Sequence, residues 1–286
     1  MLKVYGFSRV NKMARGKTRD LRVLWALEEM GLPYDVVGMD HPRHDLDTPA
    51  YRALNPFGQI PMIDDDGVVV TESGAILLYL ARKSGKLMPR DLAGEAQVLR
   101  WCVAALNTIE VPVLTAWFVD LNDGKGTKAS AALHQWSDMR LKQLDGWLAG
   151  RKFVATDEFT VADILVTHVL GAGTDESVVK DYPNVLGFQR RCIARPAWKK
   201  TFDAYCDRVK ASRERGRRWR TVCCGSRWVG SKQRKHPHKP LRHPTAILPQ
   251  PVAGPRALPA KRGWGRTRDG RSRSRRCARI PRTRRR

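Results

Sequence analysis

The chain has 286 residues, with 53 Lys and Arg against 28 Asp and Glu, and a formal net charge of +25. Residues 213–286 hold 25 of the basic residues and only two acids, so residues 1–212 are nearly neutral. The basic composition therefore describes the tail, and the body has the composition of an ordinary soluble protein. No long apolar core follows the N-terminus, and the six cysteines have no metal-ligand or disulfide spacing. We expect a cytoplasmic protein without a metal site or a membrane span.

The first part of the chain predicts a small α/β domain. Short strands are expected over 2–5 and 34–37, with an aperiodic loop over 6–17. A helix opens at Thr18, which is a good N-cap residue, and ends at Gly31. The crossover helix makes the two strands parallel.

The stretch from Asn55 to Ser73 predicts a β-hairpin that leads into a helix. Its strands lie over 60–63 and 68–71, and the Asp-Asp-Asp-Gly run between them is typical of a hairpin turn. A short helix over 48–54 precedes the hairpin, and a longer one over 73–83 follows it. Ser73 lies at a helix start, where free N–H groups favour a carboxylate or phosphate.

Beyond a predicted linker over 84–93, no strand pattern recurs. A capping box, in which Thr160 and Asp163 satisfy each other's backbone N–H groups, marks one helix start. The longest apolar run, 101–119, is interrupted by polar residues and predicts a buried helix rather than a membrane span. Helical periodicity marks the segments 95–121, 129–148, 161–170, 183–194 and 197–210.

Four motifs in register resemble the cytosolic glutathione S-transferases of bacterial type. They are Asn-Pro-Phe-Gly-Gln-Ile-Pro at 55–61, Glu-Ser-x-Ala-Ile at 72–76, Phe-Thr-Val-Ala-Asp at 159–163 and Arg-Pro-Ala-Trp at 195–198. The resemblance covers residues 1–210. It implies a thioredoxin-like α/β domain (βαβ-α-ββα) followed by an all-α domain, and a homodimer. The implied boundaries are 1–83 for the glutathione-binding domain, 84–93 for the linker, 94–212 for the helical domain and 213–286 for the tail.

The resemblance also implies a site for glutathione on the 55–73 stretch. Pro61 would follow a cis peptide bond, and the backbone of Ile60 would pair with the cysteinyl part of glutathione. Gln59 would lie near the peptide backbone. Ser73 would bind the γ-glutamyl carboxylate, and Glu72 would face the ammonium group. No metal is implied.

The group that activates the glutathione thiol is less well defined by the sequence. Family members place a Tyr, Ser or Cys after the first strand, and here the loop is longer and offers Thr18 and Ser8. We favour Thr18, with Arg19 beside it, because a helix start is the position that stabilises a thiolate. The competing interpretation is that Thr18 serves only as an N-cap. His44 lies where some relatives bind the glycyl carboxylate, although a loop histidine is more often simply exposed.

A small electrophile is expected between the two domains. By their position in the sequence, five residues are expected to line the site for this electrophile: Trp101, Asn107, Glu110, Trp117 and Phe118. The same residues would also suit a hydrophobic core or a dimer interface.

The predicted function is nucleophilic attack of the glutathione thiolate on this electrophile, as in detoxification, or a related glutathione-dependent reduction or isomerisation. The alternative is a non-catalytic module for dimerisation or assembly. The composition of the tail, rich in Arg, Pro and Gly, predicts that it is disordered. Its arginines and tryptophans suit non-specific nucleic-acid binding, and its abrupt composition also fits translation in a shifted reading frame.

Overall fold

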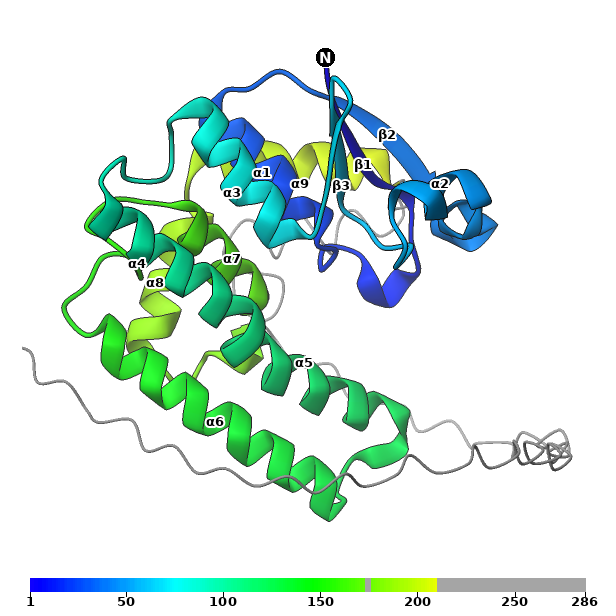
Figure 1. The fold of residues 1–286 in the computed structure, drawn as a ribbon. Helices are drawn as coiled ribbons and strands as arrows, with labels where there is room; N and C mark the ends of the chain where they lie inside the picture. The colour runs from blue at the N-terminus through cyan, green and yellow to red at the C-terminus, as the bar shows by residue number, and fades with distance from the viewer. Residues whose placement is uncertain (173–175, 210–286) are drawn as a thin grey trace, which may run out of the picture. The chain divides into compact units, whose positions relative to one another are not determined.

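The computed structural model describes residues 1–172 and 176–209. Its N-terminal part contains a four-stranded mixed sheet in the order β2-β1-β3-β4 (Figure 1). The strands are β1 (Leu2–Arg9), β2 (Asp35–Asp40), β3 (Met62–Asp65) and β4 (Val68–Thr71). As predicted, β1 and β2 are parallel, while β3 runs antiparallel to β1 and to β4.

Three α-helices accompany the sheet. Figure 1 shows α1 and α3 side by side on one side of the sheet and α2 on the other. The helices are α1 (Asp20–Met30), α2 (Pro49–Leu54) and α3 (Ser73–Ser84), with short 3-10 turns at η1 (Lys12–Ala14), η2 (His41–Arg43) and η3 (Asp45–Asp47). This order confirms the thioredoxin-like arrangement expected for the first domain.

The rest of the described chain is helical, as predicted. A capping box at Thr160 and Asp163 begins α7, as the sequence predicts. The elements are α4 (Leu92–Val103), the π-helix η4 (Ala104–Ile109), α5 (Glu110–Val119), the π-helix η5 (Asp120–Gly124), α6 (Lys128–Leu148), α7 (Val161–Val169), the 3-10 turn η6 (Glu176–Val178), α8 (Pro183–Ile193) and α9 (Pro196–Arg208). The domain boundaries proposed above remain predictions, and the tail from residue 213 lies outside the described residues.

An aromatic cluster joins the two parts of the fold. The ring of Trp25, on α1, lies 4.8 Å from that of Trp198 on α9 and 5.7 Å from that of Phe159, next to the start of α7. All three side chains are buried. Beside them, the guanidinium of Arg195 pairs with the Glu29 carboxylate at 2.6 Å. These contacts fix α1 against the helical domain.

Three sequence expectations are wrong in detail. β1 continues to Arg9, well into the predicted loop, because residues after Tyr5 keep pairing with β2. Thr18 is not the N-cap of α1: Arg19 occupies that position, and no side chain caps the helix. The apolar helix over 101–119 is not buried, since many of its large side chains, among them Val103 and Phe118, are exposed.

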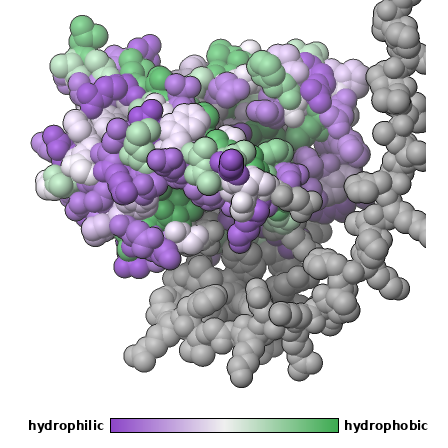
Figure 2. All heavy atoms as spheres, turned by 90° about the horizontal axis from the view of Figure 1, so that it is seen from below, coloured by the Kyte–Doolittle hydropathy of each residue, from purple (hydrophilic) through white to green (hydrophobic). Residues whose placement is uncertain are grey.

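The exposed helix belongs to the continuous helical segment Leu92–Asn122. By length and composition this segment is able to cross a membrane, and 28% of its most apolar window is buried. One such helix is weak evidence for a membrane span. Figure 2 shows apolar side chains exposed in several places between polar ones on the face seen from below.

Candidate active site between the two domains

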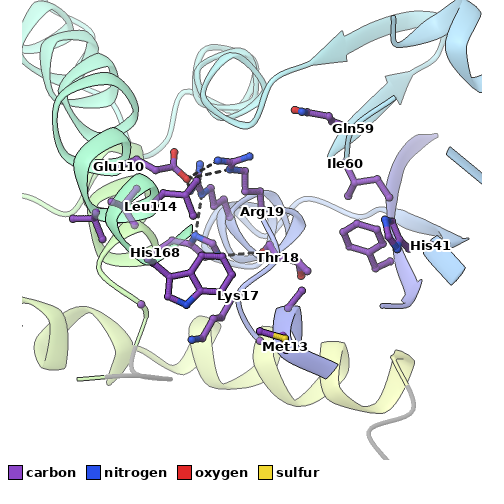
Figure 3. Close-up of a pocket in the computed structure, with 18 of the residues that line it drawn as sticks. Met13, Lys17, Thr18, Arg19, His41, Gln59, Ile60, Glu110, Leu114 and His168 are labelled. Carbon is purple, nitrogen blue, oxygen red and sulfur yellow. Dashed lines mark hydrogen bonds and ion pairs between the residues drawn. The ribbon is translucent and has the colours of Figure 1, made fainter. Parts of the chain in front are cut away.

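A cavity of about 500 Å³ lies where β1, the start of α1 and the segment before β3 meet the helical domain. Polar side chains gather at the start of α1, where Leu114 and Glu110 of α5 lie beside Arg19 (Figure 3). Ile60 and His41 lie on the other side of the cavity. The lining residues are Phe7, Met13, Ala14, Gly16, Lys17, Thr18, Arg19, Arg22, His41, Leu46, Gly58, Gln59, Ile60, Glu110, Val113, Leu114, Trp117, His168, Val169, Gly171 and Val178. A cavity of this size and mixed lining suits a small ligand with both charged and apolar parts.

Gln59 and Ile60, which are predicted to bind glutathione, line the hairpin side of the cavity together with Gly58. The bond between Ile60 and Pro61 is cis, as the resemblance implied. Two side chains hold the carbonyl group of Gln59. It accepts hydrogen bonds from the Tyr51 hydroxyl at 2.6 Å and from the Asn55 amide at 2.7 Å. These two donors fix the backbone immediately before Ile60.

The opposite side is formed by the segment that enters α1. Thr18 and Arg19 both line the cavity, so the positive end of the α1 dipole borders it. Thr18 is 7% exposed, and its hydroxyl oxygen lies 2.8 Å from the hydroxyl oxygen of Tyr205. Arg19 donates to the carboxylate of Glu110 through Nε at 3.1 Å and Nη2 at 2.9 Å.

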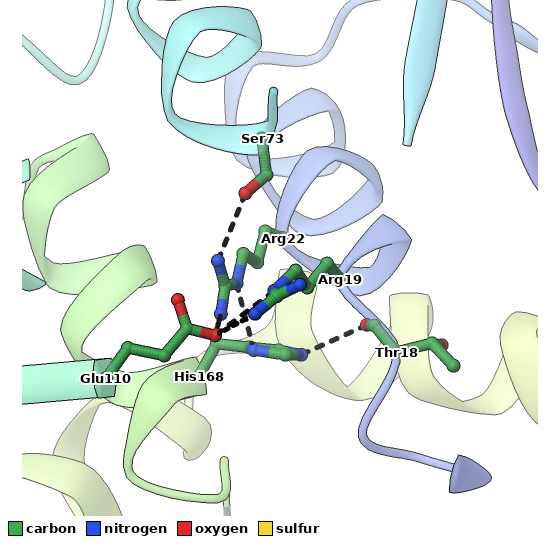
Figure 4. Close-up of polar contacts among 6 residues, drawn as sticks. All are labelled: Thr18, Arg19, Arg22, Ser73, Glu110 and His168. Carbon is green, nitrogen blue, oxygen red and sulfur yellow. Dashed lines mark hydrogen bonds and ion pairs between the residues drawn. The ribbon is translucent and has the colours of Figure 1, made fainter. Parts of the chain in front are cut away.

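Arg22 is the centre of a polar cluster at the base of the cavity (Figure 4). Its side chain is 1% exposed. It donates through Nη2 to Glu110 at 2.8 Å and through Nη1 to the Ser73 hydroxyl at 3.0 Å. It donates through Nε to Nδ1 of His168, also at 3.0 Å. Because three elements meet on one guanidinium, α1, α3 and the helical domain are fixed together at this point.

The protonation states in this cluster follow from its geometry. Burial and the charge of Arg22 lower the pKa of His168 well below its ordinary value, so the ring is neutral at pH 7. Since Nδ1 accepts from Arg22, the proton lies on Nε2, which donates to the Thr18 carbonyl at 3.1 Å. Burial tends to raise the pKa of the Glu110 carboxyl. The positive charges of Arg22 and Arg19 outweigh this effect of burial, so the pKa is lowered. Two guanidiniums and one carboxylate leave a net positive charge beside the cavity.

The predicted site residues are thus divided between the cavity and its surroundings. Thr18, Arg19, Gln59 and Ile60 line the cavity, whereas Pro61, Glu72 and Ser73 do not. Ser73 is buried and reaches the cavity through Arg22, to which it is hydrogen-bonded. Glu72, which precedes α3, is exposed.

Ser8 and His44 lie outside the cavity lining. Ser8 instead faces Gly38 of β2. The two residues are so close that a β-carbon placed on Gly38 would lie 2.9 Å from the β-carbon of Ser8. His44 is 80% exposed and pairs with Asp47 through Nδ1 at 3.0 Å. In the same loop, His41, three residues earlier, does line the cavity.

The residues expected around an electrophile are divided in the same way. Glu110 and Trp117 line the cavity, and Trp101, Asn107 and Phe118 do not. Trp101 instead packs against Trp147, with ring centroids 5.3 Å apart.

Arg22 and His168 are the residues that sequence reasoning did not find. A signal for Arg22 was present, since a lone arginine interrupts an apolar face in Leu-Arg-Val-Leu-Trp at 21–25. Arginine is rarely buried without partners, so such a position predicts a buried polar cluster. His168 gave no comparable signal, because its partners lie 146 and 150 residues away in the sequence.

Two buried cysteines among the described residues are poorly suited to act as nucleophiles. Burial raises the pKa of the Cys102 and Cys192 thiols to about 12. Within residues 1–172 and 176–209, no group of three metal-ligating side chains comes together.

The comparisons with known proteins agree with the motifs and with the fold. Family models described as the glutathione S-transferase N-terminal and C-terminal domains match residues 21–83 and 126–196. The chain is 30% identical to glutathione S-transferase hmp2 of Hypomyces subiculosus, over 63% of this chain and 91% of that protein. It is 31% identical to the disulfide-bond oxidoreductase YghU of Escherichia coli, over 63% of this chain and 67% of that protein.

Solved structures give the same result. A glutathione transferase family member from Pseudomonas fluorescens, solved with two glutathione molecules bound, superimposes with a TM-score of 0.61 at 26% identity. The match covers 70% of this chain and 92% of that one. The chain belongs to the glutathione S-transferase family.

Proposed function

We propose that this protein is a glutathione transferase whose reaction takes place in the cavity between its two domains. The observation that carries the proposal is that one cavity is lined both by Gln59 and Ile60, beside the cis-Pro61 bond, and by Thr18 at the start of α1. The first pair suits the peptide backbone of glutathione, and Thr18 is a hydrogen-bond donor near a helix N-terminus. Binding and activation of a thiol are thereby combined in one place.

In the proposed reaction, the thiol of glutathione loses its proton to solvent. The thiolate then forms a bond to an electrophilic carbon, and the leaving group departs with the electron pair of its own bond. A free thiol has a pKa of about 8.5, so the protein must favour the thiolate. The Thr18 hydroxyl, the α1 dipole and the net positive charge of the Arg22 cluster all act in that direction.

Glutathione itself is proposed to lie along the hairpin. Its γ-glutamyl carboxylate would approach Ser73, whose hydroxyl already accepts from Arg22 and retains its own hydrogen for donation. Glu72 would face the ammonium group, and Arg19 would remain close to the thiol. The apolar lining from α5, which includes Leu114 and Trp117, would contact the electrophile. Because glutathione is abundant where thiols stay reduced, we propose a cytoplasmic setting for the reaction.

Two measurements test this function. Retention on immobilised glutathione tests the binding site, and turnover of 1-chloro-2,4-dinitrobenzene with glutathione tests the chemistry. We expect both, with Thr18→Val lowering kcat at least about tenfold because the thiol loses a stabilising donor worth about one pKa unit. Ser8→Ala is the matched control and is expected to keep the rate. Binding without turnover would instead favour a non-catalytic module, and neither binding nor turnover would refute the proposal.

A second reaction, glutathione-dependent reduction of disulfides, is favoured by the resemblance to the E. coli oxidoreductase and by the Pseudomonas structure with two glutathiones. Here the thiolate would attack one sulfur of a disulfide, and the other sulfur would leave as a thiolate. A second glutathione would resolve the mixed disulfide and be released as glutathione disulfide. Reduction of 2-hydroxyethyl disulfide faster than conjugation of 1-chloro-2,4-dinitrobenzene would favour this reaction.

We also propose that the protein is a homodimer. The support is the apolar face left exposed on the Leu92–Asn122 helix, which includes Val103, Val111, Phe118 and Leu121. Burying apolar surface at about 25 cal/mol per Å² makes such a face a strong candidate for association. Light scattering on the eluting protein should give twice the chain mass, and Phe118→Glu should shift it towards the monomer. A monomer at all concentrations would refute the dimer.

A further inference from the structure

The last described helix reaches the segment that is proposed to activate the thiol. Tyr205 lies on α9 and is 1% exposed, and it is not among the residues that line the cavity. Its hydroxyl oxygen accepts hydrogen bonds from the Gly16 N–H at 3.4 Å and from the Thr18 hydroxyl at 2.8 Å. Both Gly16 and Thr18 do line the cavity. Tyr205 therefore lies directly behind the proposed catalytic hydroxyl.

The Thr18 and Tyr205 hydroxyls together have only two hydrogens to donate. Each hydroxyl has one hydrogen to donate and two lone pairs to accept with. The Gly16 N–H uses one lone pair of Tyr205 and leaves the phenolic hydrogen available. If Tyr205 donates to Thr18, the Thr18 hydrogen is released from Tyr205, and a ligand in the cavity then competes for it with the Asp20 carboxylate, which also accepts from the Thr18 side chain. If Thr18 donates to Tyr205 instead, as in this structure, no hydrogen remains for a ligand.

A bound thiolate selects the first arrangement. A thiolate is only an acceptor, so it attracts the Thr18 hydrogen, and the Thr18 oxygen is then free to accept from Tyr205. Hydrogen bonds in such a chain strengthen one another, because each acceptor becomes a better donor. Burial, and the negative charge of Asp20, raise the pKa of Tyr205 to about 12. The phenol therefore remains protonated and able to donate.

We propose that Tyr205 is a positioning residue for the reaction: its hydroxyl donates to Thr18 Oγ1, so that Thr18 donates to the sulfur of glutathione. This inference rests on the proposed function, because it assigns a role within the same reaction. It makes α9, which lies almost two hundred residues further along the chain, part of the thiol-activating machinery.

The position of Tyr205 is fixed by the neighbouring turn of the same helix. Arg208 donates through Nε to the carbonyl of Phe7 at 2.9 Å and pairs through Nη2 with Asp20 at 3.3 Å. The Asp20 carboxylate, which is fully buried, also accepts from the Phe7 N–H at 3.0 Å. These contacts tie α9 to β1 and to α1.

The charged and titratable groups around the Thr18–Tyr205 pair come from three helices and from the segment that enters α1. Asp20 belongs to α1 and Arg208 to α9, and they form an ion pair. His168, on α7, contacts the Thr18 carbonyl and is neutral at pH 7. Arg19 and Lys17, on the segment that enters α1, complete the set.

The decisive experiment compares Tyr205→Phe with the wild type in the full chain. Turnover of 1-chloro-2,4-dinitrobenzene is measured across pH, and the thiolate of bound glutathione is titrated by its ultraviolet absorbance. We expect the thiol pKa in the complex to rise by about one unit and kcat near pH 7 to fall about tenfold. The KM for glutathione should change by less than about twofold, because a positioning residue does not contact the substrate.

A double-mutant cycle tests whether Tyr205 acts through Thr18. Tyr205→Phe is expected to have no further effect on the thiol pKa in a Thr18→Val background, whereas Thr18→Ser should preserve the coupling. The matched control is Tyr182→Phe. Tyr182 also donates a hydrogen bond, to Asp138 at 2.7 Å, but does not line the cavity. This control should keep the wild-type pH profile.

The possible outcomes separate this inference from the proposed function. A wild-type protein that neither binds nor turns over glutathione refutes both. A wild-type protein that depends on Thr18, together with an unchanged pH profile in Tyr205→Phe, refutes the role of Tyr205 alone. The role is also refuted if Tyr205→Phe lowers kcat equally with and without the Thr18 hydroxyl. Melting temperatures of all variants identify any loss of rate that comes from unfolding.

Discussion

The two sides of the cavity are built in different ways. On the hairpin side, the residues that shape the site are close together in the sequence: Tyr51 and Asn55 hold the Gln59 carbonyl across eight and four positions. On the α1 side, Thr18 contacts residues that lie 150 and 187 positions away. The first side is a local structure, and the second exists only when the whole body of the chain has folded.

This difference separates ligand binding from chemistry. The hairpin presents a backbone to the proposed tripeptide and depends on its own turn and on α2. The α1 side supplies the proposed thiol-activating hydroxyl and depends on α5, α7 and α9. Damage to the helical domain is therefore expected to remove turnover before it removes the shape of the hairpin. The predictions below test that separation, beginning with the largest effect.

Arg22→Met should cause the largest loss of stability. It removes hydrogen bonds to Glu110, Ser73 and His168 at once, and it leaves the partly buried Glu110 carboxylate with Arg19 alone. Breaking a buried ion pair on one side costs about 3–5 kcal/mol. Urea unfolding should report this loss in the free energy of unfolding.

The matched control for Arg22 is Arg190→Met. Arg190 forms a two-point ion pair with Glu176 in the helical domain, but both side chains are largely exposed. The urea unfolding midpoint of the Arg190→Met variant should therefore be close to that of the wild type. Equal midpoints for the Arg22 and Arg190 variants would show that the cluster does not link the two domains.

Asn55→Ala tests the hairpin side and should have a smaller effect. Asn55 is 2% exposed, and it shares the Gln59 carbonyl with Tyr51. Loss of one of two donors to a buried acceptor should cost about 1–2 kcal/mol. Since both donors serve one acceptor, Tyr51→Phe and Asn55→Ala should not be additive. Simple additivity in urea unfolding would argue against a shared function.

The same contrast explains what the sequence could predict. The hairpin turn has positive φ angles at Asp66 and Gly67, as the Asp-Gly pair indicates. Thr48 caps α2 with its side chain. Such features depend on a few neighbouring residues, so the order of strands and helices was predictable. The cis bond before Pro61 was predictable through the family resemblance.

What the sequence did not reveal depends on contacts between distant segments. Thr18 was expected to cap α1 with its side chain, but the hydroxyl is engaged by Tyr205 and the cap position moves to Arg19. His44 and His41 differ by three positions, and only the path of the loop decides which of them reaches the cavity. Burial of the 101–119 helix was inferred from its composition, but composition does not determine which face of a helix is covered.

His168→Gln should change how stability depends on pH. The folded pKa of His168 lies well below the unfolded value of about 6.5. Below that value the unfolded chain binds a proton that the folded protein does not. His168 therefore makes the wild type lose stability as the pH falls, by at most about 1.4 kcal/mol per pH unit.

The His168→Gln variant lacks this term, so its stability should fall less steeply than that of the wild type below pH of about 6.5. Comparing the two proteins removes the opposite contribution of Asp163, whose pKa is raised by burial to about 6. Urea unfolding at several pH values gives both slopes. Parallel slopes would show that His168 is protonated in the folded protein, contrary to its contacts with Arg22 and Thr18.

The smallest effect should come from the two loop histidines. His41 lines the cavity beside Phe7, with ring centroids 6.1 Å apart, and His44 points to solvent and to Asp47. A hydrogen bond from an exposed histidine to the glycyl carboxylate is worth about 0.5–1.5 kcal/mol, so His41→Ala should weaken glutathione binding about threefold to tenfold. His44→Ala should leave the Kd unchanged in calorimetric titrations. The reverse result would mean that this loop rearranges when glutathione binds, and the hairpin side would then be less fully formed in advance than its local hydrogen bonds indicate.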